Sequence, residues 1–251
     1  MVVYFVIPCY YDDDVLPSTG PVFLSKLHTL IDQSVIDEDS RVIFVNDGST
    51  DRTWEQIEHL HEDDPHCIGI NLSQNVGEQD ATLAGLFYAN VYADCCITMD
   101  SDLQDDINMV DQMIHLFAQG NEVVFGVRKS RKKDVLFEKV TSKLFYIVMR
   151  IAEPRSIPNH SSFRLMSKRT IEWLREFSEI SFFLPVLVAS FNLPYSIVYY
   201  DRLPRAAGLS GYNFKKRLKL GTNAFLSHIA LRQGHPRKKA ASNVKIQQIL
   251  D

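Results

Sequence analysis

The sequence predicts an α/β protein built on a largely parallel, twisted β-sheet with helices on both faces. The first observation is a regular alternation over residues 1–128 of short apolar runs, suited to buried strands, with stretches of helical character. The second is that polar clusters follow the apolar runs, such as CYYDDD after the first run and NDGSTD after the second. In parallel sheets ligands bind beyond the carboxyl ends of the strands, so this edge is the expected functional site.

The first half of the chain is expected to contribute five strands and four helices. The strands are expected at residues 2–8, 41–47, 67–73, 95–100 and 122–128. The helices are expected near residues 20–34, 53–62, 78–91 and 107–119. After residue 128 the pattern changes to longer helices, with further candidate strands at 163–167 and 195–202, and the basic run 128–134 is interpreted as a loop.

The composition fits a globular protein and excludes several other classes. A chain of 251 residues that is 45% hydrophobic can bury one sizeable core, or one core with an appended segment. The cysteines lie in or beside apolar runs without the spacing of metal ligands, and are interpreted as reduced core thiols of a cytosolic protein: Cys9, Cys67, Cys95 and Cys96. Pro8 and Asp12 interrupt the N-terminal apolar run, which has no basic leader, so we interpret it as a strand and not as a signal peptide. No apolar stretch is long enough for a transmembrane helix, and none is expected.

The run TMDSDLQDD, residues 98–106, concentrates acidic side chains at the end of the fourth expected strand. Like charges at this density repel, and no Lys or Arg lies between Asp94 and Asp111 to compensate them. In a turn at a strand end, the carboxylates of Asp100 and Asp102 can converge on one hard divalent cation. The sequence therefore favours a metal site here over a solvated acidic turn.

Charge is distributed unevenly along the chain. Residues 1–120 contain 3 basic and 22 acidic side chains, whereas residues 202–251 contain 11 basic side chains and 1 acidic one. We therefore expect residues 1–120 to bind a cation and residues 202–251 to bind phosphates or an anionic surface.

The segment NDGSTDRT, residues 46–53, places turn-forming residues directly after the second expected strand. Thr50 or Asp51 can cap the helix that follows. Asp47, at the tip of a buried strand, can accept hydrogen bonds from the N–H groups of a nucleobase. Taken alone, the segment is explained as well by a simple loop.

Seven motifs follow one another along the chain between residue 2 and about residue 232: PCYYDD, VNDGSTDRT, NVGEQDATLAGL, MDSDLQDD, GVRKSR, SSFRLMSKR and RAAGLSGY. Together, and in this order, they resemble the motifs of the family 2 glycosyltransferases of the GT-A fold. The branch with the greatest resemblance includes dolichol-phosphate mannose synthases and bacterial polyprenyl-phosphate glucosyltransferases. The resemblance implies an inverting enzyme that moves a sugar from a nucleotide-diphospho-sugar, a UDP-sugar in the bacterial branch, to a polyprenyl phosphate or related acceptor, using Mg²⁺ or Mn²⁺.

The resemblance also implies which residues bind the sugar donor. The nucleotide would be bound by residues of five motifs: Pro8, Tyr10, Asp12, Asp47, Asn75, Gly77, Asp100 and Ser210. Asp100 and Asp102 match the D-x-D pair that holds the metal on the diphosphate, and Gln104 completes D-x-D-x-Q. With Arg205, which matches an arginine that faces the diphosphate, these three residues form the implied catalytic set.

The phosphate of the acceptor is expected to bind the basic segment after the fifth strand. The residues that the resemblance implies are Arg128, Arg131, Lys139 and Ser142. The sequence departs from the family pattern in the first motif, where Asp12 stands in place of Glu, and in the last, where Gly211 stands in place of Lys.

The largest departure lies before Phe163. The usual Asp-x-Gly-Asp is replaced by Asn159, His160, Ser161 and Ser162, so both acids are absent. Their absence fits a phosphate acceptor, whose oxygen is already anionic and needs no general base. It also leaves open that His160 is the base for a hydroxyl acceptor of a glycan or glycolipid.

A non-catalytic partner subunit that binds nucleotide sugars stays open as a second class, although the intact D-x-D-x-Q disfavours it. A nucleotidyltransferase is disfavoured because CYYDDDVLP is acidic where that class carries a Gly-rich basic loop. Neither the composition nor the motifs predict a nucleic-acid partner.

We expect a catalytic domain at residues 1–212, with a nucleotide-sugar and metal half (1–127) and an acceptor half (128–212), followed by a basic amphipathic helix and tail at 213–251. Within 213–231 an apolar stripe lies beside four basic residues of the first turns. The stripe fits packing on the catalytic domain or docking on a membrane, and the basic residues favour docking. The expected location is cytoplasmic, peripheral on the inner face of the cell membrane, beside a possible membrane partner protein.

Overall fold

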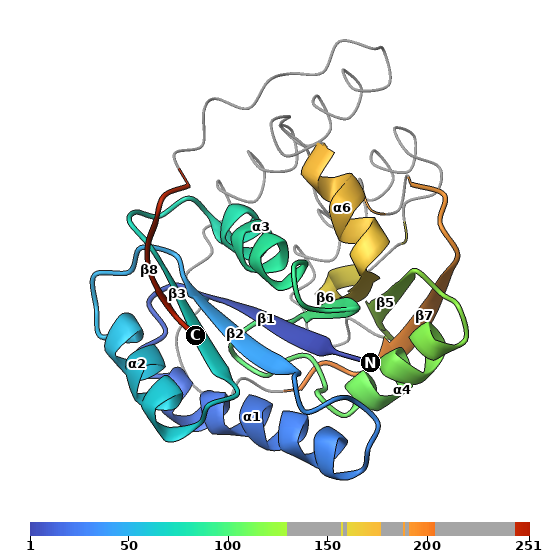
Figure 1. The fold of residues 1–251 in the computed structure, drawn as a ribbon, viewed down its shortest axis with the longest axis horizontal. Coiled ribbons are helices and arrows are strands. Elements are labelled where there is room, and N and C mark those ends of the chain that lie inside the picture. The colour runs from blue at the N-terminus through green and yellow to red at the C-terminus, as the bar shows by residue number, and fades with distance from the viewer. Residues whose placement is uncertain (130–156, 158–159, 177–187, 189–190, 204–243) are drawn as a thin grey trace, which may run out of the picture.

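The central element of the fold is an eight-stranded β-sheet with the order β7-β5-β6-β4-β1-β2-β3-β8 (Figure 1). This computed structural model describes residues 1–129, 157, 160–176, 188, 191–203 and 244–251. The strands are β1 (Val3–Cys9), β2 (Arg41–Asn46), β3 (Cys67–Leu72), β4 (Cys95–Thr98), β5 (Val123–Arg128), β6 (His160–Ser167), β7 (Tyr195–Tyr200) and β8 (Ile246–Leu250).

Most of the sheet is parallel, as the sequence predicted. β1 pairs in parallel with β2 and β4, β2 with β3, and β5 with β7. β6 lies between β4 and β5 and is antiparallel to both, and β8 is antiparallel to β3 at the sheet edge. The carboxyl ends of β1–β5 and β7 therefore meet at one edge of the sheet, together with the start of β6.

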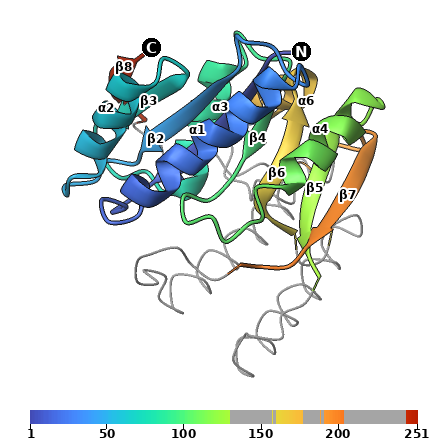
Figure 2. The same ribbon diagram turned by 90° about the horizontal axis from the view of Figure 1, so that it is seen from below.

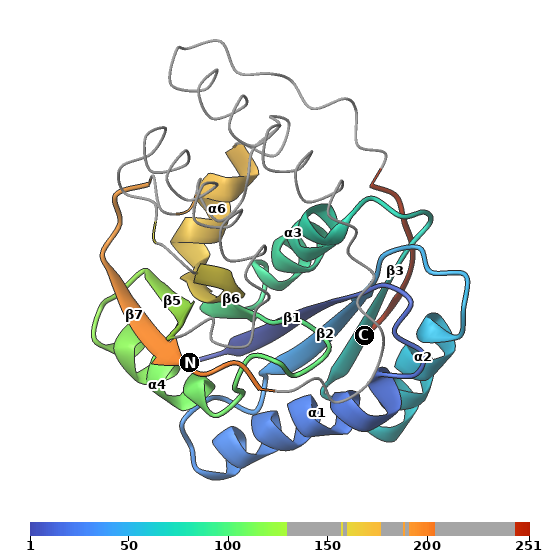
Figure 3. The same cartoon turned by 180° about the vertical axis from the view of Figure 1, so that it is seen from behind.

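Helices cover both faces of the sheet (Figures 2 and 3). On one face lie α1 (Leu16–Asp32), α2 (Thr53–Asp63) and α4 (Met109–Ala118), and on the other lie α3 (Glu78–Ala89) and α6 (Lys168–Glu176). Each strand of the parallel core is apolar on both sides because each face is buried under helices, and this produces two hydrophobic cores separated by the sheet. The first is centred on Phe5, Phe23 and Phe44, and the second on Val6 and Leu86.

Of the strands in the described residues, the sequence predicted all but one. The strand β8 was not expected, because these residues were placed in the C-terminal tail. The boundary at residue 212 stays a prediction, since residues 204–243 lie outside the described part of the chain. Helix α1 begins earlier than the expected residue 20, because Pro17 is tolerated in the first turn of a helix, where its missing N–H would be unpaired anyway.

All four cysteines are buried and free, which confirms their interpretation as core thiols. Among the described residues, no helix combines the length and the apolar character that crossing a membrane requires.

At Gly85, helix α3 lies very close to the sheet. A Cβ atom at this position would lie 2.5 Å from Val6 Cγ1 and 2.9 Å from Val45 Cγ2, closer than packed carbon atoms allow. The absence of a side chain at residue 85 thus sets the distance between α3 and the strands β1 and β2.

We therefore expect Gly85→Ala to lower the free energy of unfolding by about 1–3 kcal/mol through overpacking, reduced by the gain of about 1 kcal/mol in helix propensity. Urea unfolding of the Gly85→Ala, Val6→Ala and double variants measures the coupling. The loss should be smaller in the Val6→Ala background, where the nearest methyl group is gone. Equal effects of Gly85→Ala in both backgrounds would show that Val6 does not set this distance.

Candidate functional site

The candidate site lies at the carboxyl edge of the sheet, where the sequence placed it. The loops after β1 and β4 each contain a non-glycine residue with positive φ, Tyr11 (54°) and Leu103 (51°). Such conformations are uncommon outside glycine and are found preferentially at functional sites. Gly48, after β2, has φ 62° and packs on the backbone of Gln74 and Asn75, so the loops after β2 and β3 are in contact.

Asp12 joins the loop after β1 to the acidic loop after β4. Its Oδ2 accepts hydrogen bonds from the Ser101 hydroxyl (2.8 Å) and from the backbone N–H of Tyr10 (3.0 Å), while its own N–H donates to Thr53 Oγ1. Burial raises the pKa of Asp12, and the hydrogen bond from Ser101 partly offsets this effect. The ring of Tyr10 in the same loop is exposed, so a planar base can stack on it.

Asp47 is nearly fully buried and holds the loop between β3 and α3. Its carboxylate accepts hydrogen bonds from Asn75 Nδ2 (2.9 Å) and from the backbone N–H groups of Val76 (2.7 Å) and Gly77 (3.0 Å). Burial raises the pKa of Asp47, and the two backbone hydrogen bonds lower it. The structure thus brings together Asp47, Asn75 and Gly77, which the sequence analysis expects to bind the nucleotide, and Asp47 positions the loop that carries the other two. Its expected contact with a nucleobase stays a prediction.

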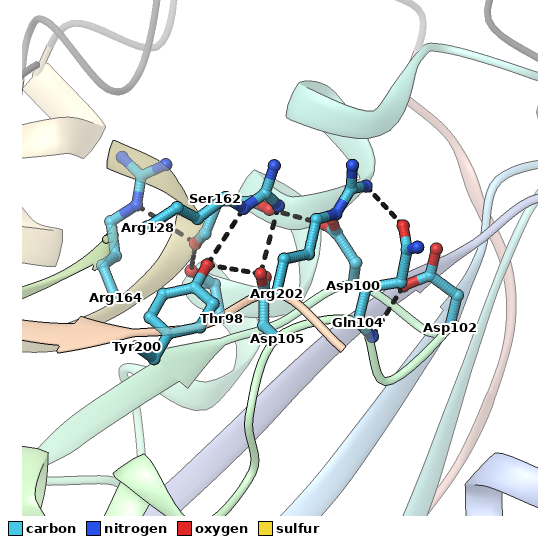
Figure 4. A network of polar contacts seen from close by, with 10 residues as sticks. All are labelled: Thr98, Asp100, Asp102, Gln104, Asp105, Arg128, Ser162, Arg164, Tyr200 and Arg202. Atoms are coloured by element: carbon cyan, nitrogen blue, oxygen red, sulfur yellow. Dashed lines mark hydrogen bonds and ion pairs between the residues drawn. The ribbon is translucent and has the colours of Figure 1, made fainter. Parts of the chain in front are cut away.

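The acidic loop after β4 presents Asp100, Asp102 and Gln104, all partly buried and all next to the sheet edge (Figure 4). The Ser162 hydroxyl donates to Asp100 Oδ1 at 2.5 Å, and Asp102 Oδ1 accepts the backbone N–H of Gln104 at 3.1 Å. These carboxylates are the hard oxygen donors that Mg²⁺ and Mn²⁺ prefer.

Behind this loop lies a buried ion pair that the sequence did not predict. Arg128 Nη2 donates to Asp105 Oδ1 at 3.1 Å, and the Tyr200 hydroxyl donates to the same oxygen. Arg128 Nε also donates to the Tyr200 hydroxyl at 3.2 Å. Burial and the charge of Asp100 raise the pKa of Asp105 to about 6 even beside Arg128. Arg128, expected to bind the acceptor, thus has a buried carboxylate as its partner; the contact with the acceptor stays a prediction.

Three further residues were missed by sequence reasoning. Arg202 donates to Gln104 Oε1 (Figure 4), and partial burial and the charge of Arg128 lower its pKa. Arg164 of β6 is buried and donates to the Ser162 carbonyl, and burial lowers its pKa to about 10. Glu78 opens α3 and is exposed; desolvation by the nearby protein atoms and the charge of Asp100 raise the pKa of its carboxyl group.

One of these residues could have been found from the sequence. Arg202 is the last residue of the expected strand 195–202, and a polar residue at the end of a parallel strand lies at the ligand-binding edge. Glu78 and Arg164 carry no such signal, since nothing local indicates that a helix start and an antiparallel strand meet at this edge.

Several expected site residues lie outside the described part of the chain. They are Arg131, Lys139, Ser142, Arg205 and Ser210. For His160 the structure describes only the backbone, at the start of β6. The roles implied for these residues stay predictions.

The Asp105–Arg128 pair yields a stability prediction. Arg128→Met leaves a buried carboxylate without its partner and should lower the free energy of unfolding by about 3–5 kcal/mol at pH 8. A carboxyl group with a raised folded-state pKa binds a proton more readily in the folded than in the unfolded state, so acidification favours folding. The loss should therefore be smaller at pH 5, where Asp105 is protonated.

Urea unfolding at the two pH values measures both effects. The control is Arg169→Met, which removes an exposed pair with Glu122 (3.7 Å) and should cost less than about 1 kcal/mol at either pH. A loss for Arg128→Met that is independent of pH would mean that the Asp105 carboxylate is not its cause.

Comparison with solved structures confirms the GT-A fold. Glucosyl-3-phosphoglycerate synthase from Mycobacterium tuberculosis, in complex with Mn²⁺, UDP and phosphoglyceric acid, has a TM-score of 0.63 to this chain at 14% identity. The match covers 94% of this chain and 79% of that one.

Curated relatives are more similar in sequence. The uncharacterized glycosyltransferase YkoT of Bacillus subtilis is 38% identical over 226 residues, which cover 90% of this chain and 67% of the relative. The bactoprenol glucosyl transferase of Shigella phage SfV is 28% identical over 228 residues, 90% of this chain and 72% of the relative. The chain thus spans about two thirds of the length of the curated relatives that it matches. The model of the family described as glycosyl transferase family 2 matches residues 4–186, and this chain therefore belongs to that family.

Proposed function

We propose that this protein transfers a sugar from a nucleotide-diphospho-sugar to a polyprenyl phosphate or a related membrane-associated acceptor, with inversion at the anomeric carbon. The observation that carries the proposal is the pair Asp100 and Asp102, partly open at the carboxyl edge of the sheet and flanked by arginines, in a chain of this family. The name of the phage SfV relative supports the choice of a polyprenyl acceptor.

The donor site needs positive charge, since the departing nucleoside diphosphate accumulates negative charge on its phosphates. Asp100 and Asp102 would hold Mg²⁺ or Mn²⁺, which supplies this charge as a Lewis acid when bound. These two side chains fit such an ion, because both carboxylates are accessible and Asp100 is held in place by the Ser162 hydroxyl. The Mycobacterium tuberculosis neighbour, which shares the fold, was crystallised with Mn²⁺ and UDP.

The described residues of the chain act by binding and orienting the donor. Asp47 fixes the β3–α3 loop, and Asp12 links the β1 loop to Ser101. Arg202 provides a guanidinium beside the acidic loop, where it can donate to a phosphate oxygen.

The acceptor site supports a phosphate nucleophile. A hydroxyl acceptor requires a general base within hydrogen-bond reach, whereas a phosphate oxygen is already ionised. The Ser162 hydroxyl, at a position where the family carries an acid, is hydrogen-bonded to Asp100. Ser162 is thus a neutral donor, which favours an anionic acceptor over one that must be deprotonated.

The acceptor is a membrane lipid in this proposal, so we also propose that the protein docks on an anionic membrane surface through the basic amphipathic segment 213–231. This segment lies outside the described residues, and its role is supported by the sequence pattern alone.

Release of UDP tests the proposed reaction. With a UDP-sugar and Mn²⁺, UDP release should depend on added polyprenyl phosphate, and Asp102→Asn should abolish it. Calorimetry should show that Mn²⁺ strengthens UDP binding to the wild type but not to this variant. The control is Asp106→Asn in the same loop, since Asp106 accepts hydrogen bonds from Asn108 and should leave activity near normal. A rate of UDP release that does not change when polyprenyl phosphate is added, but increases with a hydroxyl acceptor, would contradict the proposed acceptor.

Arg131 tests the acceptor site. Arg131→Ala should raise the KM for polyprenyl phosphate by about 10- to 100-fold, as expected for a lost charge-assisted hydrogen bond of about 1.5–3 kcal/mol. The affinity for UDP should not change. The control is Lys129→Ala, two positions away in the same basic run. Equal effects of the two variants would indicate a general effect of charge in place of a defined phosphate contact.

A further inference from the structure

A cluster of two histidines and one aspartate lies outside the candidate site. His28 belongs to α1, Asp64 ends α2, and His66 directly precedes β3. Their ligand atoms, one from each residue, all lie within 4.8 Å of one another. Because β3 starts at Cys67 and the acidic loop lies beyond the carboxyl ends of the strands, the cluster is at the opposite edge of the sheet from Asp100 and Asp102. Figure 1 shows α1 and α2 packed side by side on the face where the cluster lies.

Asp64 is the centre of this cluster. Its Oδ2 lies 2.6 Å from His28 Nε2, and its Oδ1 lies 3.3 Å from His66 Nδ1. The backbone N–H of His66 donates to Oδ1 at 2.9 Å and fixes the carboxylate. The two imidazole rings are 4.8 Å apart and nearly perpendicular, so their nitrogens approach Asp64 from different directions.

The His66 Nδ1 atom indicates that the cluster is a ligand site and not only an ion pair. It is buried and has no hydrogen-bond partner, because its contact with Asp64 Oδ1 lacks hydrogen-bond geometry. An unpaired buried nitrogen costs free energy, and native structures rarely leave one without a partner. A cation between Nδ1 and the carboxylate would satisfy it. Burial raises the pKa of Asp64, but the hydrogen bonds from His28 and from the backbone of His66, together with the charges of the two histidines, outweigh this effect and keep the pKa below its usual value, so the group is an anionic ligand.

The chemistry of the three side chains indicates which metal ion they would bind. Two imidazoles and one carboxylate are typical ligands of Zn²⁺, whereas Mg²⁺ and Mn²⁺ prefer oxygen alone. In a tetrahedral zinc site, bonds of about 2.0–2.2 Å place the ligand atoms about 3.3–3.6 Å apart. His28 and His66 contact different oxygens of Asp64, so one of these oxygens and the two ring nitrogens, which lie within 4.8 Å of one another, must move by about 1 Å to reach this spacing. The exposed side of His28 leaves a fourth position open to water.

We propose that His28, Asp64 and His66 form a binding site for a divalent transition-metal ion, with Zn²⁺ as the best fit. The ion connects α1 to the junction of α2 and β3, and so stabilises the helical face of the sheet. This site is separate from the proposed donor site, and it does not depend on the proposed function.

Calorimetry of the full-length wild-type protein with Zn²⁺, after treatment with EDTA, tests the site. One equivalent of Zn²⁺ should bind saturably and raise the melting temperature. His66→Gln and His28→Gln should each weaken this binding at least tenfold. His59→Gln, which changes an exposed histidine of α2 next to Glu55 and Glu62, is the control and should bind as the wild type does. Asp102→Asn should also retain Zn²⁺ binding, and this separates the site from the donor site.

Spectroscopy of the wild type gives a second result that does not depend on the folding of any variant. Co²⁺ in a site with two imidazoles and one carboxylate should show the intense visible absorption of four-coordinate Co²⁺, and Zn²⁺ should displace it. Spectra of six-coordinate aqueous Co²⁺ only, or Zn²⁺ binding that both histidine variants retain, would overturn the proposal.

Discussion

The buried ion pair between Asp105 and Arg128 connects the parts of the chain that form the candidate site. Asp105 comes from the loop after β4, Arg128 from the end of β5, and Tyr200, which donates to the same carboxylate oxygen, from the end of β7. Removal of charges from water is favourable only when each charge is paired and hydrogen-bonded, so this contact fixes the geometry of three segments at once. The acidic loop, with Asp100 and Asp102, keeps its place because Asp105 at its far end is held.

The fold could be predicted from local patterns wherever a strand is buried on both faces. The apolar runs of β1 to β5 are continuous because helices cover both sides of the sheet, and this signal is unambiguous. The strand β8 has the opposite character: it lies at the edge, and most of its residues are exposed, so it has no apolar pattern to detect. The insertion of β6 between β4 and β5 is a property of long-range pairing, which no local pattern encodes.

The difference between local patterns and long-range packing also explains which parts of the candidate site could be predicted. Asp12, Asp47 and the acidic loop were predicted as site residues because each lies at or shortly after the end of a predicted strand, and parallel strands bring their carboxyl ends together. The partners of these residues were not found, since they are set by packing between distant segments. Asp47 is the clearest example, because its position was predicted while its hydrogen bonds to the β3–α3 loop depend on how two loops fold against each other. Arg164 is another, since it reaches the site only because β6 runs antiparallel.

The origin of the positive charge at the site explains why a cation and an anionic ligand would bind together. The basic residues of the first part of the chain have partners elsewhere: Lys26 pairs with Asp111, Arg41 donates to backbone carbonyls, and Arg52 lies 4.0 Å from Asp13. Among the described residues, the guanidinium groups at the acidic loop therefore come from β5, β6 and the end of β7. Burial and, to a smaller extent, the negative charge of Asp100 raise the pKa of Asp105 to about 6, so further negative charge at this edge is unfavourable. An anionic diphosphate alone would add such charge, whereas a divalent ion reduces it and also ligates the phosphates. The electrostatics of the edge thus favour the metal and the nucleotide as one unit over either component alone.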